Sequence, residues 1–263
     1  MDAERLKDAC VQWIADWFAP FGPQACAVLG MSGGKDSTVA AALCASALGP
    51  ERVVGVAMPS GSQPVNDADE ICEWLGIRYV CLNIGEVETA LRALGEPFRP
   101  AVAGPGDTMA GGGQTGFSRQ AVLNIPPRIR MTVLYAVAQT VGGLVANTCN
   151  LSEDYIGYAT LYGDAAGSFS PLGHLCVREV LAVGRALGLP EKWVGKTPDD
   201  GLPGSMPDEQ KFGFSYAVLD RYIREGVCDD EAVRAKIDRM HRANLFKTQM
   251  LHIPAFEPDP SWL

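Results

Sequence analysis

The chain has 263 residues, of which 47% are hydrophobic and 20% are charged. These values are close to the averages of folded globular proteins, so they exclude general disorder, and the length suits one large α/β domain. The formal net charge of −9 is spread along the sequence without a basic stripe, which argues against nucleic acid as a partner. A phosphorylated ligand would have to be held locally, by backbone amides, a few cations and a metal ion.

The first ten residues, MDAERLKDAC, are acidic where a secretion signal needs a basic start followed by an apolar run. No apolar stretch approaches the roughly 18 residues of a membrane span. We therefore expect a cytoplasmic protein with no membrane partner. The eight cysteines form no CxxC pair and have mostly apolar neighbours, which is typical of reduced, buried thiols.

Apolar periodicity predicts alternating helices and strands in the first part of the chain. An amphipathic helix is expected over residues 2–19. Three apolar, β-branched runs then predict strands, and a helical pattern follows each of them, so that strands at 25–31, 52–59 and 78–84 alternate with helices at about 37–48, 66–75 and 85–94. This alternation indicates βαβ units and a doubly wound parallel sheet.

A glycine-rich segment without periodicity occupies residues 95–117, and two interpretations of it stay open: a plain surface loop, or a lid that covers substrate. A helix is expected from about 118 to 141, interrupted at Pro126 and Pro127, followed by a fourth strand at 142–148. The remaining segments are two loop-like stretches at 160–175 and 196–209, and two helices at 214–225 and 229–246. We expect one domain over residues 1–263.

The most informative segment joins the first predicted strand to the first long helix. Gly33 and Gly34 permit a tight turn that brings backbone N–H groups close to phosphate oxygens, and the helix start adds its dipole. Asp36 would repel phosphate unless a divalent cation lies between them, so this acid favours Mg²⁺. The spacing does not match the GxxxxGK[ST] loop of enzymes that cleave between the β- and γ-phosphates. The segment that we expect to bind ATP is Gly30, Met31, Ser32, Gly33, Gly34, Lys35, Asp36 and Ser37.

The hexapeptide SGGKDS in this segment resembles the SGGxDS pyrophosphate loop of the N-type ATP pyrophosphatases, which adenylylate a carboxylate or carbonyl oxygen. Nearly the whole chain further resembles the ammonia-dependent NAD synthetases, through the stretches 124–131, 147–153, 157–160, 163–164, 196–202 and 208–209. The resemblance implies the N-type ATP pyrophosphatase fold. It also implies amidation of deamido-NAD with ammonia and ATP, through an adenylylated carboxylate, to give NAD, AMP and pyrophosphate.

The resemblance makes Asp36 and Glu153 the expected catalytic residues and Mg²⁺ ligands, and it adds Thr148 and Asp199 to the ATP contacts. The residues themselves support part of this assignment. Thr148 and Glu153 follow the fourth predicted strand. They should therefore lie at the same sheet edge as residues 30–37, which we call the phosphate loop. An alternative stays open, in which Asn150 and Glu153 form a capping box that only starts a helix.

Arg128 and Arg130 are two apart on a predicted helix and should point to different faces, so we expect one to bind phosphate or carboxylate and the other to form an ion pair. The resemblance implies that Arg128 is the one that contacts the dinucleotide substrate. It also implies a homodimer with substrate at the interface. The other substrate contacts that it implies are Asn124, Leu161, Asp164 and Ser168, with His241 or Lys247 from the C-terminal part of the chain.

Some of these positions depart from the family pattern. Leu161 stands where the family usually has a cation, Ser168 where it usually has an aspartate, and Asp199 where it has a hydroxyl residue. Three interpretations stay open: compensated change in one pocket, a divergent paralogue that amidates another small carboxylic acid, and a non-catalytic nucleotide-binding sensor. No glutaminase domain fits beside this one, so nitrogen would come from free ammonia or from a separate glutaminase subunit.

Overall fold

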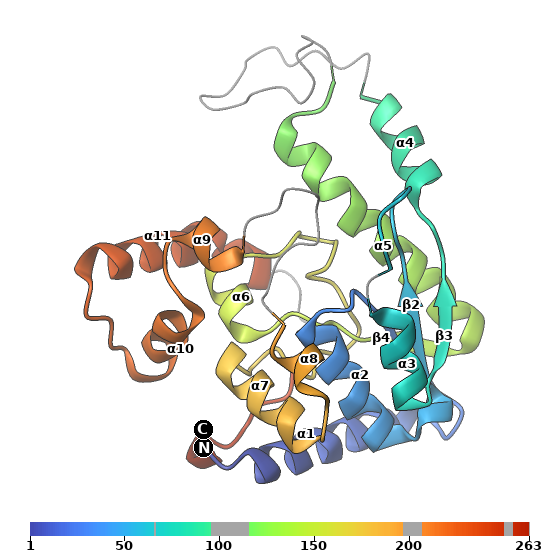
Figure 1. Cartoon of the computed structure of the whole chain (residues 1–263), viewed down its shortest axis with the longest axis horizontal. Helices are drawn as coiled ribbons and strands as arrows, with labels where there is room; N and C mark the ends of the chain where they lie inside the picture. Colours follow the sequence, from blue (N-terminus) through green and yellow to red (C-terminus); the bar gives the residue numbers. More distant parts are fainter. Residues whose placement is uncertain (66, 96–115, 197–206, 250–254, 263) are drawn as a thin grey trace.

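A computed structural model of the chain describes all residues except 66, 96–115, 197–206, 250–254 and 263 (Figure 1). In the described part of the chain, four parallel strands form one sheet in the order β3-β2-β1-β4. They are β1 (Cys26–Gly30), β2 (Val53–Ala57), β3 (Arg78–Cys81) and β4 (Gly143–Val145). The predicted parallel sheet is confirmed, and its fourth strand is shorter than expected.

The position of β1 inside the sheet explains why this strand is apolar along its whole length. Val28 of β1 pairs with Val54 of β2 on one side and with Val145 of β4 on the other. Ala27 and Leu29 contribute to one hydrophobic core, whereas Val28 contributes to a second core on the opposite face. Both faces are therefore buried, as is usual in parallel sheets.

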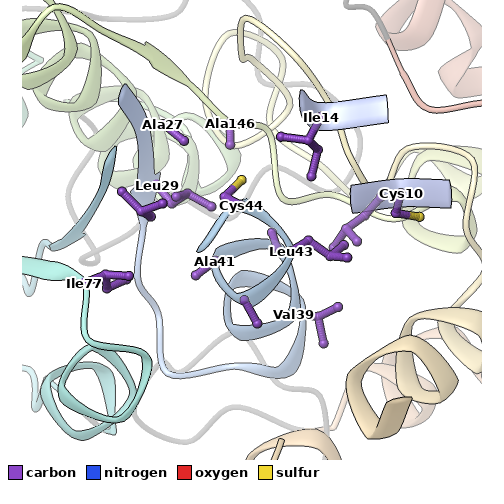
Figure 2. Packing of buried hydrophobic residues seen from close by; sticks show 14 of the residues in the cluster. Cys10, Ile14, Ala27, Leu29, Val39, Ala41, Leu43, Cys44, Ile77 and Ala146 are labelled. Carbon is purple, nitrogen blue, oxygen red and sulfur yellow. The ribbon is translucent and has the colours of Figure 1, made fainter. Parts of the chain in front are cut away.

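Helices cover both faces, which confirms the doubly wound arrangement. The helices α2 (Lys35–Leu48) and α3 (Ala68–Leu75) pack on one face, with α1 (Ala3–Phe18) and α7 (Val177–Ala186) stacked outside α2. Figure 2 shows this core, where side chains from α1, α2 and β1 meet. The long helix α5 (Arg119–Val141) covers the other face, and α4 (Gly85–Ala93) lies beside it.

The remaining helices complete the fold beside the sheet. They are α6 (Leu151–Ile156), α8 (Glu191–Val194), α9 (Asp208–Phe212), α10 (Tyr216–Glu225) and α11 (Glu231–Gln249), together with short 3₁₀ helices at Ala19–Phe21, Pro50–Arg52 and Pro260–Trp262. A third core joins α6, α10 and α11, and these helices form a group apart from the sheet (Figure 1). The two ends of the chain lie together, since the backbone N–H of Asp2 donates to the carbonyl of Trp262 at 3.2 Å.

Three differences from the sequence-based expectations concern helices. The helices α7 to α9 were not expected, whereas α6 begins where the capping-box alternative at Asn150 placed a helix start, and α9 begins inside the stretch predicted as a loop. The predicted interruption at Pro126 and Pro127 is wrong, because α5 runs through both. A proline cannot donate to the carbonyl four residues before it, which normally breaks a helix. Pro127 lies close to the segment after α6, since a Cβ added to Gly163 would come within 2.9 Å of it.

All eight cysteines are free thiols, and six of them are buried, which agrees with the prediction except at exposed Cys81 and half-buried Cys228. Burial raises the pKa of the Cys44 thiol to about 12. Among the described helices, none is long and apolar enough to cross a membrane. The glycine-rich segment at 95–117 falls almost entirely outside the described residues, so its interpretation as a lid stays a prediction.

Candidate active site

A cleft of about 420 Å³ opens at the carboxyl ends of β1, β2 and β4. The strand order reverses direction between β1 and β4, and open α/β sheets bind their ligands at such a switch point. The described residues that line the cleft come from the phosphate loop, the segments after β2 and β4, and one side of α5. The site predicted from the phosphate loop is therefore a real cavity at the predicted edge of the sheet.

The phosphate loop has the conformation that its glycines predicted. Gly33 adopts a positive φ of 75°, and Gly34 is the N-cap of α2 but offers no capping side chain. Within the described residues, no acceptor is found for the backbone N–H groups of Lys35, Asp36 and Ser37. Because this first turn lines the cleft, its N–H groups are available to an anion, and the dipole of α2 favours one there.

Asp36 is held from two sides. Its Oδ2 accepts from Lys35 Nζ at 2.6 Å, and its Oδ1 accepts from Asn150 Nδ2 at 3.1 Å. Asn150 belongs to the loop after β4, so this contact ties the phosphate loop to the neighbouring strand. The carboxylate is therefore fixed at the floor of the cleft before any ligand binds.

Glu153, on the first turn of α6, also lines the cleft. Burial and the negative charge of Asp36 raise the pKa of Glu153 to about 8, and Lys35 opposes this shift. Its backbone N–H donates to Asn150 Oδ1 at 3.1 Å, so the Asn150 side chain caps α6. The Glu153 carboxylate lines the cleft, as Asp36 does. The two interpretations of Glu153 are compatible.

Three charged residues of the cleft were not named as site residues from the sequence. Asp208 is buried and accepts from the Tyr158 hydroxyl at 3.0 Å. Arg130 donates through Nε to the Met58 carbonyl at 3.0 Å and lines the cleft from α5. Lys196 donates to Asp67 Oδ2 at 3.1 Å and lies at the mouth near Gly33. Asp208 and Lys196 belong to the stretches that carry the family resemblance, so the resemblance could have identified them as site residues. To identify Arg130, one would have had to know which face of α5 points to the cleft.

The two arginines of α5 do point to different faces, as predicted. Burial lowers the pKa of Arg130, with Glu88 and Asp164 opposing the shift. Arg128 is exposed, stays outside the cleft, and donates to the Leu161 carbonyl at 3.2 Å. The ion pair expected for one of them is not found in the described part of the chain. Arg128 as a substrate contact remains a prediction.

Several residues predicted to contact the acid substrate lie beside the cleft, on the segment that packs against the start of α5. Asn124 Oδ1 accepts from the Thr160 hydroxyl at 3.1 Å, next to the contact between Arg128 and Leu161. Asp164 accepts from the Thr160 backbone N–H at 3.0 Å and lines the cleft, as Thr148 does. These side chains are placed to contact an acid substrate that enters the cleft from the α5 side.

Other predicted contacts are farther away or lie beyond the described residues. Ser168 is beside β4, where its backbone N–H donates to the Val145 carbonyl at 2.7 Å. His241 Nδ1 is 2.8 Å from the Tyr155 carbonyl. Lys247 donates to the carbonyl of Gly157 at 2.7 Å and lines a second, smaller cavity of about 100 Å³. Asp199 belongs to the range 197–206 and is not described. The roles of these four residues stay predictions.

Residues 8–252 match the family described as NAD synthase. The NH₃-dependent NAD⁺ synthetase of Methanococcus aeolicus is 37% identical over 199 residues, which are 74% of this chain and 72% of that protein. The NH₃-dependent NAD⁺ synthetase of Carboxydothermus hydrogenoformans is 35% identical over 232 residues, which are 86% of this chain and 88% of that protein.

Solved structures agree with these relatives. An NMN synthetase from Francisella tularensis has a TM-score of 0.82 at 26% identity and covers 97% of this chain and 99% of its own. An NH₃-dependent NAD synthetase from Campylobacter jejuni has a TM-score of 0.71 at 27% identity, with 96% and 99% covered. Together with the phosphate loop and its cleft, these matches show that the chain belongs to the NAD synthase family.

Proposed function

We propose that this chain amidates the nicotinate carboxylate of deamido-NAD with ammonia and ATP, and releases NAD, AMP and pyrophosphate. The observation that carries the proposal is the cleft, in which the N–H groups of the first turn of α2 adjoin the carboxylates of Asp36 and Glu153. The relatives in Methanococcus aeolicus and Carboxydothermus hydrogenoformans, both named NH₃-dependent NAD⁺ synthetases, support this acceptor and this nitrogen source.

Activation is needed because a carboxylate is a poor electrophile toward an amine. An oxygen of the acceptor carboxylate attacks the α-phosphorus of ATP, and the bond from that phosphorus to the leaving pyrophosphate breaks. Ammonia then attacks the acyl carbon, the bond to AMP breaks, and one proton is released. The N–H groups of Lys35, Asp36 and Ser37 would bind the departing pyrophosphate and stabilise its charge, which is electrostatic rather than acid–base assistance. No described histidine lines the cleft.

The donor set fits Mg²⁺. Asp36 and Glu153 offer carboxylate oxygens, the ligands that Mg²⁺ prefers, and a bound cation would oppose the burial and the charge of Asp36 that raise the pKa of Glu153. When bound, Mg²⁺ supplies positive charge to the phosphate chain. The protein's own part is to hold Asp36 through Lys35 and Asn150, and to place Glu153 by capping α6.

A second acceptor has a specific observation in its favour. The Francisella tularensis protein, named an NMN synthetase, has a TM-score of 0.82, against 0.71 for the Campylobacter jejuni NAD synthetase. Leu161 also lacks the cation that the family usually has there. The alternative acceptor is therefore the acid form of the mononucleotide, which would be amidated by the same chemistry.

The experiment incubates the protein with ATP, Mg²⁺, an ammonium salt and either acid, and identifies products by mass spectrometry. We expect NAD and AMP from deamido-NAD, with a higher kcat/KM than for the mononucleotide acid. A higher kcat/KM for the mononucleotide acid would move the assignment to the second candidate. ADP and orthophosphate as the products would contradict both candidates, and nucleotide binding without turnover would support the sensor interpretation.

We also propose a homodimer that uses the outer surface of α4. Val87, Leu91 and Leu94 are exposed there at helical spacing, beside α5. Exposed apolar stripes of this kind are typical of subunit contacts. Light scattering after size exclusion should give twice the chain mass for the wild type and one chain mass for Leu91→Glu, while Val227→Glu, an exposed apolar position elsewhere, should keep the dimer. Ammonia would come from solution or from a separate glutaminase.

A further inference from the structure

Lys35 occupies an unusual place for a cation. It is the first residue of α2, directly before Asp36, and only 4% of it is exposed. The start of a helix carries a positive partial charge, and burial removes the hydration of an ammonium group, so both effects disfavour lysine at this position. A lysine here needs compensating negative charge nearby.

The compensation comes from the carboxylates of the cleft. Lys35 Nζ is 2.6 Å from Asp36 Oδ2, and it lies 5.7 Å from the centre of the Tyr216 ring, which covers it. Burial lowers the pKa of Lys35, but the charges of Asp36, Glu153 and Asp208 outweigh burial, and the net pKa is raised. The ion pair with Asp36 directs the ammonium group at that carboxylate.

Asp208 has a cation of its own, because Lys211 Nζ lies 3.3 Å from its Oδ1. Lys35 therefore serves mainly Asp36, one of the two residues proposed to hold Mg²⁺. An ammonium group 2.6 Å from the Asp36 carboxylate offsets the negative charge of that carboxylate. By Coulomb's law, this weakens the attraction of the carboxylate pair for a free divalent cation, most strongly where water is scarce.

We propose that Lys35 is a positioning residue that acts as a tethered counter-cation for Asp36. In the absence of nucleotide, its ammonium group keeps the Asp36 carboxylate in place and prevents tight binding of a free divalent cation. Asp36 would then bind a metal ion only together with ATP, whose phosphate chain would supply the negative charge that Lys35 offsets. The inference rests on the proposed function only in taking this cleft as the ATP site.

The test measures metal binding without nucleotide and without acceptor. Mn²⁺ is titrated into wild type, Lys35→Gln and Lys192→Gln, and free Mn²⁺ is followed by electron paramagnetic resonance. We expect Lys35→Gln to bind Mn²⁺ at least about tenfold more tightly than wild type, because the Asp36 carboxylate is left without its cation. Lys192, an exposed lysine paired with Glu70, is the matched control and should leave the affinity unchanged. The gain should vanish in Lys35→Gln with Asp36→Asn.

A melting curve gives a second readout. Lys35→Gln should melt below wild type in EDTA and recover in Mn²⁺, whereas wild type should barely respond to Mn²⁺. Lys35→Met, whose side chain fills a similar space without a charge, should behave like Lys35→Gln. Unchanged Mn²⁺ affinity with a raised KM for ATP would identify Lys35 as a phosphate ligand and overturn the proposal. So would loss of folding by both variants even in Mn²⁺. Neither readout needs turnover, so the proposed function can fail independently.

Discussion

Asn150 Nδ2 donates to Asp36 Oδ1 at 3.1 Å, which joins two residues 114 positions apart in the sequence. The Oδ1 atom of the same amide accepts from the Glu153 backbone N–H at 3.1 Å and caps α6. The Asn150 side chain is completely buried. One amide group therefore sets the positions of both proposed metal ligands, Asp36 through a side-chain contact and Glu153 through the start of its helix.

The first prediction separates these two roles of Asn150. Asn150→Asp keeps a good capping oxygen but loses the donor to Asp36 and adds a repelling charge, so AMP-forming turnover should fall at least about a hundredfold. Asn150→Ala loses the cap as well, and should also lower the free energy of unfolding by about 1 kcal/mol or more. Initial rates and denaturant melts check both changes.

A matched control for this pair is Asp2→Ala, which removes the N-cap of α1 far from the cleft. It should lower stability by about 1 kcal/mol and leave the KM values and kcat unchanged. If Asn150→Asp kept wild-type turnover, the contact with Asp36 would not matter for the reaction.

The second prediction concerns Glu153→Gln. Glutamine can still act in a capping box, so the helix should remain capped, while the carboxylate proposed for Mg²⁺ is gone. Turnover should fall by orders of magnitude with the fold intact, and Asp36→Asn should behave in the same way. Steady-state kinetics and circular dichroism test this expectation. A variant with full turnover and a lowered melting temperature would instead assign Glu153 to helix capping alone.

The third prediction is a pH dependence of stability in EDTA. Burial and neighbouring carboxylates raise the pKa of Glu153 to about 8, and burial and Asp164 raise the pKa of Asp154 to about 7. The folded protein then holds protons that the unfolded chain has released, so the free energy of unfolding should fall as the pH rises from about 5 to about 8. The melting temperature, measured across this range, follows the change.

Glu153 and Asp154 should each account for a separate part of this fall in the free energy of unfolding with pH. Glu153→Gln should flatten the decline up to about pH 8, and Asp154→Asn should flatten the part up to about pH 7. Mg²⁺ should oppose the decline in wild type, because it favours the ionised form of Glu153. A wild-type stability that rises over this range would show that neither acid is protonated in the folded state.

The fourth prediction is that the two arginines of α5 act on different substrates. Arg130 lines the cleft and is held by the Met58 carbonyl, so Arg130→Gln should lower kcat/KM for ATP by about tenfold or more. Arg128 lies outside the cleft beside Leu161, so Arg128→Gln should lower kcat/KM for the acceptor and leave the KM for ATP unchanged. Varying one substrate at a time separates the effects, and the opposite split would exchange the roles.

Sequence reasoning reached the fold and the phosphate loop because both depend on short-range patterns. The apolar runs of β1 to β3 and the two glycines of the loop determine their structure locally, so strand, turn and helix followed directly. The pairing of Asp36 with Asn150 did not follow, because a contact across 114 residues leaves no periodic trace. The path of α5 through Pro126 and Pro127 did not follow either, because the local chemistry of proline predicts a break and the neighbourhood of Pro127, near Gly163, cannot be derived from the sequence.

Charge balance within the cleft was missed for a similar reason. Asp36 in an anion-binding loop was interpreted as a requirement for a metal ion, but its nearest cation is Lys35, the adjacent residue in the sequence. Sequence order gives no information on whether a lysine side chain turns toward solvent or into the core. Only the burial of Lys35 by Tyr216 and the carboxylates shows that it turns inward.

The last prediction concerns Leu161 and Ser168, which depart from the family pattern together. Leu161 is half-buried and its carbonyl accepts from Arg128, so a cation close to Leu161 already exists in the structure. We therefore expect the loss of a family cation and a family anion to be compensated, and deamido-NAD to be amidated by the wild type. Leu161→Lys with Ser168→Asp should change kcat/KM for deamido-NAD by less than about tenfold.

Each single substitution should be worse than the pair, since it adds one unpaired charge to a partly buried region. Kinetics with deamido-NAD and with the mononucleotide acid test the set. A gain of one to two powers of ten in the double variant, about 1.4–2.7 kcal/mol of transition-state binding, would mean that these positions had changed the acceptor. Wild-type turnover of deamido-NAD equal to a control without enzyme, in a folded protein that binds ATP, would give the same answer, because the cleft would then serve a different acid.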